Sequence, residues 1–161
     1  MTSTAPSARR LVDDLLARIQ ERAPAERAAA LREFARAYVR RISTEVLETL
    51  GADDLYGQIA GIFELADGRG SRPFVVRAFN PTVAADGYSA AGTVVETNCE
   101  DSPFLVDSVS EELAARGLEV RVVIHPVIGT ERGVDGRIAR VLHARDAPTR
   151  ESVMHFEVDR R

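Results

Sequence analysis

The chain has 161 residues, of which 45% are hydrophobic and 29% charged, and its formal net charge is −4. This composition is typical of a globular protein with one domain, or of a small domain with an appended helical segment. The acidic balance excludes the global basic field of a nucleic-acid-binding protein. All 21 basic residues are arginine, which excludes Schiff-base chemistry and a P-loop lysine.

Cysteine usage and hydropathy predict the compartment. The single cysteine, Cys99, has no partner for an internal disulfide, as expected in a reducing cytoplasm. No run of about 18 apolar residues is present, and residues 1–7 lack the apolar core of a signal peptide. We therefore expect a cytoplasmic protein that binds neither membranes nor nucleic acid.

The first 68 residues predict three or four helices, because apolar residues recur there at helical spacing. The helices are expected at 8–22, 25–41, 46–50 and from Asp53 onwards. Pro24 fits a first turn, Ser43 offers a cap, and Gly51 ends the short helix. The glycine-containing residues 67–71 are typical of a linker. We therefore divide the chain into a helical segment, 1–70, and an α/β sandwich domain, 71–161.

The second segment alternates strands with turns, and one helix lies near its middle. Strands are expected at 73–80, 93–97, 120–127, 138–142 and 153–158. Loops or turns are expected at 84–89, 129–136 and 146–150. Ser102 is expected to cap the helix, with Pro103 in its first turn and Gly117 at its end. The stretch from 92 to 127 is thus a β-α-β unit.

The turn before this helix is the best candidate for ligand contact, because free N–H groups at a helix start attract carboxylates and phosphates. Asn98 can add an amide, and Glu100 or Asp101 can receive an ammonium group, so a zwitterionic amino acid suits the site. A self-capped turn without a ligand explains the residues equally well. The candidate ligand-binding residues are Asn98, Cys99, Glu100, Asp101, Ser102 and Phe104.

Two further chemistries receive less support from the sequence. Cys99 and His125 can form a nucleophile and base, but the acidic neighbours of Cys99 disfavour a thiolate. His155 and Glu157 share one strand face, although the usual zinc spacings are missing. We therefore expect no catalytic residue and no metal site.

Several ordered motifs carry a resemblance to known proteins. Residues 101–109, Asp-Ser-Pro-Phe-Leu-Val-Asp-Ser-Val, resemble the strand-to-helix turn of ACT domains, whose usual signature is Asp-x-Pro-Gly-Leu. Together with two further runs they resemble the N-terminal region of the large bacterial NAD-specific glutamate dehydrogenases. The further runs are 76–82 and 123–127, and the same family is matched by 53–56 and 154–160. The resemblance extends over roughly 34–160, most of the chain.

The resemblance implies an α+β chain: N-terminal helices, then a ferredoxin-like, ACT-type mixed or antiparallel sheet with a packed helix. It implies a noncatalytic regulatory or assembly region of an enzyme that oxidises L-glutamate. The implied parent uses NAD, whereas this segment is expected to hold no cofactor. The implied partners are the rest of the enzyme chain, other copies in a homo-oligomer, and an amino-acid effector.

Two departures from the ACT pattern affect this expectation. Phe104 stands where the usual signature has glycine, and a phenylalanine ring there obstructs a ligand or fills its pocket. The pattern also ends at Arg161, before a second helix and a fourth strand. Either 73–80 supplies another strand, or part of the sheet face stays uncovered and needs a partner. A purely structural oligomerisation module is therefore the alternative to an amino-acid sensor.

Overall fold

The computed structural model describes residues 6–161. Its N-terminal part contains four helices, as the apolar spacing predicted. They are α1 (Pro6–Arg22), α2 (Ala25–Val39), α3 (Thr44–Leu47) and α4 (Ala52–Asp67). The hydroxyl of Ser43 caps α3 by accepting a hydrogen bond from the backbone N–H of Val46 at 3.3 Å. No helix within residues 6–161 is long and apolar enough to cross a membrane.

The rest of the chain forms one six-stranded sheet. Its strands are β1 (Phe74–Phe79), β2 (Thr93–Glu100), β3 (Val120–Ile124), β4 (Val127–Arg132), β5 (Ile138–Leu142) and β6 (Thr149–Val158). The helical segments between them are α5 (Val83–Asp86), α6 (Leu105–Ala115) and the 3-10 helix η1 (Ala144–Asp146). All the strand pairings are antiparallel.

The last strand, β6, lies at the centre of the sheet. It pairs with β2 along one side, and with β3 and then β4 along the other. The unit β2-α6-β3 therefore crosses over β6, so that β2 and β3 run parallel with β6 between them. This split β-α-β arrangement confirms the expected α+β, ferredoxin-like fold. β1 adds a strand beside β2. This is the first of the two alternatives from the sequence, in which residues 73–80 supply another strand.

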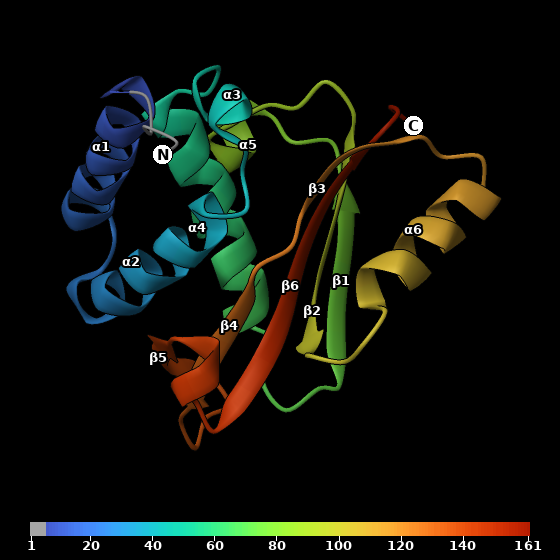
Figure 1. Ribbon diagram of the computed structural model, residues 1–161. Helices are drawn as coiled ribbons and strands as arrows, with labels where there is room; N and C mark the ends of the chain where they lie inside the picture. Colours follow the sequence, from blue (N-terminus) through green and yellow to red (C-terminus); the bar gives the residue numbers. More distant parts are fainter. Residues whose placement is uncertain (1–5) are drawn as a thin grey trace.

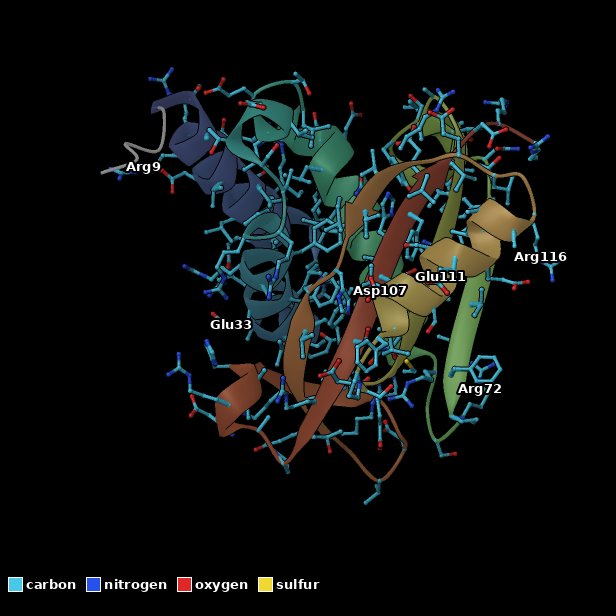
Figure 2. All side chains as sticks on the ribbon, turned by 45° about the vertical axis from the view of Figure 1, so that its right-hand side comes forward. Arg9, Glu33, Arg72, Asp107, Glu111 and Arg116 are labelled. Carbon is cyan, nitrogen blue, oxygen red and sulfur yellow. The ribbon has the colours of Figure 1, made fainter. Side chains whose placement is uncertain are left out.

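The two faces of the sheet carry different layers. The helices α1, α2 and α4 lie on one side, here the inner face, and α6 lies on the other, the outer face (Figure 1). The inner core joins these helices to the sheet through buried residues that include Phe34, Ile59 and Val153. The outer core is smaller and consists of Met154, Phe156 and Val158 beneath Leu113 of α6. Asp107 and Glu111 lie on the exposed surface of α6, and the exposed Arg116 follows its last residue (Figure 2).

The structure differs from the predicted elements at three places. The predicted strand at 120–127 divides into β3 and β4 around His125 and Pro126, because proline has no N–H for a sheet ladder. The predicted turn at 129–136 is shorter, since β4 continues to Arg132 and only 133–136 turn. Helix α5 lies in the predicted loop at 84–89, where the hydroxyl of Thr82 caps it.

Candidate functional site

The predicted ligand turn is partly a strand. β2 continues to Glu100, so Asn98, Cys99 and Glu100 belong to it. Because side chains alternate along a strand, Asn98 and Glu100 face the inner side while Cys99 faces the outer side. The structure therefore does not bring these three side chains together, as a ligand site at the turn requires.

Asn98 belongs instead to a buried network around Glu151 of β6. The side chains of Asn98 and Glu151 are fully buried. The Glu151 carboxylate accepts hydrogen bonds from Nη2 of Arg69 and Nη2 of Arg132, each at 2.8 Å. Asn98 accepts from Nε of Arg69 at 2.7 Å, and its own Nδ2 donates to Glu151 at 3.2 Å. Every polar atom of the Asn98 amide is thus occupied by the protein itself.

The network fixes the charge of Glu151. Burial by itself would raise the pKa of the Glu151 carboxyl, but hydrogen bonds from Arg132, Thr130 and Arg69 outweigh burial and lower the pKa to about 2. Buried carboxylates with several charged donors hold elements together and leave little capacity for another ligand. We therefore assign this network to stability.

The start of α6 differs from the prediction. The helix begins at Leu105, Ser102 is exposed, and the capping position is held by Phe104 without a side-chain hydrogen bond. Phe104 has a φ of 64°, and among residues 6–161 it is the only non-glycine residue with a positive φ. This left-handed conformation costs a residue with a Cβ roughly 1–2 kcal/mol. The Phe104 ring is also 78% exposed, so packing within the domain does not offset that cost.

The remaining predicted residues have other partners. Asp101 lies 3.4 Å from Nη2 of Arg150, and its backbone N–H donates to the Arg150 carbonyl at 2.9 Å. His125 makes its hydrogen bond to the hydroxyl of Ser152 at 2.7 Å and not to Cys99. Burial raises the pKa of the Cys99 thiol, which disfavours a thiolate nucleophile.

A second row of polar side chains crosses the inner face. Arg77, Glu96 and His155 are direct neighbours on β1, β2 and β6. The fully buried Glu96 accepts a hydrogen bond from Nε of Arg77 at 2.6 Å, and its other oxygen lies 2.9 Å from Nδ1 of His155. The His155 side chain therefore contacts Glu96. The Glu157 carboxylate accepts a hydrogen bond from the backbone N–H of Gly92. This row was not predicted from the sequence, although a glutamate within the β-branched run 93–97 could have indicated a buried partner.

The split β-α-β sheet with its strand-to-helix turn defines the class of this domain as ACT-like. A family described as the ACT1 domain of glutamate dehydrogenase matches residues 34–161. The chain belongs to this family.

Two curated relatives support the assignment. The chain is 33% identical over 153 residues to the NAD-specific glutamate dehydrogenase of Halomonas elongata. The matched segment covers 93% of this chain and 10% of that protein. It is 30% identical over 131 residues to the NAD-specific glutamate dehydrogenase of Pseudomonas aeruginosa, covering 79% of this chain and 8% of that protein. The chain thus spans about a tenth of the length of these relatives. No solved structure matches it.

Proposed function

We propose that this domain is a noncatalytic assembly and regulatory region of an NAD-dependent glutamate dehydrogenase. The parent enzyme would convert L-glutamate, NAD⁺ and water into 2-oxoglutarate, ammonia and NADH in the cytoplasm. The names of the two relatives support this parent activity. The observation that carries the assembly role is an exposed apolar surface on the outer face of the sheet.

This surface, the outer apolar patch, consists of Phe74 and Val76 on the outer face of β1, together with the exposed Phe104 at the start of α6. Their exposed fractions are 63%, 53% and 78%. Phe74 and Val76 lie on β1, whose second edge makes no strand pairing within residues 6–161. The start of β1 and the start of α6 lie at the same end of the sheet (Figure 1). Exposed aromatic side chains beside an open sheet edge are typical of association surfaces.

The occupant of the patch would be another part of the parent enzyme. α6 covers only part of the outer face, and the relatives provide about nine times more polypeptide than this domain contains. The strained backbone of Phe104 supports the same interpretation, because local strain at an exposed residue indicates a role outside the domain's own packing. Sensing of an amino acid at the turn receives less support, since Asn98 is already fully hydrogen-bonded.

The test compares full-length enzymes, whose NADH production from L-glutamate and sedimentation are both measured. The paired variant Phe74→Ser/Val76→Ser is expected to lower the assembled fraction or the thermal midpoint of the enzyme. Val134→Ser is the matched control, because Val134 is also an exposed valine but lies on the β4–β5 hairpin, and β5 and β1 are at opposite ends of the strand order. The 161-residue chain alone is expected to show no turnover. Unchanged assembly and midpoint in the paired variant would refute the assembly role.

A further inference from the structure

A cleft of about 600 Å³ lies between the C-terminal half of α2 and the chain that surrounds η1. α2 and the residues after it contribute most of one wall, and the other wall comes from β4, the end of β5 and the start of β6. Its charged lining consists of Glu33, Arg36, Arg40, Arg41 and Arg150, with His143 beside them. Glu33 lies at the outer edge of α2, on the side of the molecule that carries η1 (Figure 2).

The charges of this cleft are unbalanced. Four arginines stand against one glutamate, in a chain whose formal net charge is −4. Nε of Arg36 lies 3.6 Å from Glu33, and Nη2 of Arg150 lies 3.4 Å from Asp101. Within residues 6–161, the side chains of Arg40 and Arg41 make no ion pair and no hydrogen bond. The cleft therefore concentrates positive potential that the protein does not neutralise.

Helix electrostatics explain only part of this arrangement. Arginines at the end of α2 interact favourably with the negative end of its dipole, which accounts for Arg36, Arg40 and Arg41. Arg150 comes from β6, where it pairs with Asp101, and it lines the same cleft, so the helix dipole does not account for its place beside the three arginines of α2 and the turn after it.

We propose that the cleft binds a small polyanion through its carboxylate or phosphate oxygens. Guanidinium groups match both through paired, charge-assisted hydrogen bonds. The volume is within the range of small-molecule sites, about 300–1,000 Å³. The cleft shares none of its lining residues with the outer apolar patch or with the predicted turn residues, so this site is separate from the proposed assembly surface.

The experiment is calorimetric titration of the 161-residue chain with 2-oxoglutarate and, separately, with inorganic phosphate. Sodium chloride holds the ionic strength constant, so that screening is the same in both titrations. At least one of the two anions is expected to bind. The variant Arg40→Gln/Arg41→Gln is expected to weaken that binding at least about tenfold, because each charge-assisted hydrogen bond contributes more than 1 kcal/mol.

The matched control is Arg9→Gln/Arg10→Gln, which removes two exposed helical arginines from α1 and changes the net charge equally. It is expected to bind like the unchanged protein. Binding of 2-oxoglutarate alone identifies a dicarboxylate site, and binding of phosphate identifies a phosphate site. No binding of either anion, or equal weakening by both double variants, overturns the proposal. The Phe74→Ser/Val76→Ser variant keeps anion binding, so failure of this site leaves the assembly role standing.

Discussion

The two faces of the sheet differ in how completely the rest of the domain covers them. Three helices cover the inner face, and charged side chains such as Glu96 and Glu151 are buried there with their partners. The outer face has one helix, a small apolar core and the exposed residues Phe74 and Val76. The inner face therefore carries most of the buried contacts of the domain, while the outer face carries the exposed apolar surface that we propose for association.

The strongest test of this comparison removes the central charge of the inner face. Glu151→Ala leaves the buried Arg69 and the partly buried Arg132 without their carboxylate, so the free energy of unfolding should fall by about 3–5 kcal/mol. Urea unfolding followed by circular dichroism measures the change. Glu131→Ala is the control, because the Glu131–Arg140 pair is largely exposed and should contribute less than about 1 kcal/mol. Equal losses in the two variants would contradict a stabilising role for the network.

Acidification tests the same carboxylate without removing its volume. The folded pKa of Glu151 is about 2, below its ordinary value of 4.5. A depressed pKa gives stability that is present above pH 4.5 and is lost as the pH falls towards 2. The unfolding midpoint should therefore decline over this interval more steeply in the unchanged protein than in Glu151→Gln. Parallel declines in urea titrations at each pH would show that Glu151 does not control acid stability.

Relieving the strained backbone of Phe104 should change the free energy of unfolding by a smaller amount than the Glu151 substitution, and in the opposite direction. Phe104→Gly relieves the positive φ, so it should raise the free energy of unfolding of the isolated domain by up to about 1 kcal/mol. Phe104→Val should lower it by about 1–2 kcal/mol, because a β-branched residue is strained there. Thermal unfolding compares the two. A destabilised glycine variant would mean that the ring itself supports the fold.

The smallest effect is expected on the open part of the outer face. Val76→Ser should change the stability of the isolated domain by less than about 0.5 kcal/mol, because Val76 is 53% exposed. Phe156 lies on the same face beneath α6, so Phe156→Ala should lower the free energy of unfolding by about 3–5 kcal/mol. Chemical unfolding of both variants separates the two regions. A large loss from Val76→Ser would show that the patch is already part of the domain's own core.

The sequence predicted the elements with clear periodicity. The helices α1, α2 and α4 and most strands follow from apolar spacing, and Gly117 ends α6 as expected, with a φ of 72°. These features depend on neighbours along the chain, and local physics is sufficient to place them. The family resemblance was confirmed, and the division of the chain at residue 70 stays a prediction.

The buried contacts of Asn98, Arg69 and Asp67 were harder to predict, because the residues that they contact are distant in the sequence. Arg69 was assigned to a linker, yet it binds Glu151, 82 residues away. Asp67, in the same predicted linker, accepts a hydrogen bond from the backbone of Ile138, 71 residues away. A glycine-containing segment gives no local sign of such pairing. For the same reason Asn98 was assigned to a ligand rather than to the interior.

The central position of β6 has a consequence for biosynthesis. β6 (Thr149–Val158) follows the other five strands of the sheet in the chain, yet β2, β3 and β4 all pair with it. While the ribosome is still adding these residues, the earlier strands have emerged without their common neighbour. From the end of β2 at Glu100 to the end of β6 at Val158 the ribosome adds 58 residues (158 − 100), which takes about 3–12 seconds at translation rates of about 5–20 residues per second. Throughout this interval the earlier strands lack their common partner β6, and unpaired strand edges of this kind favour aggregation.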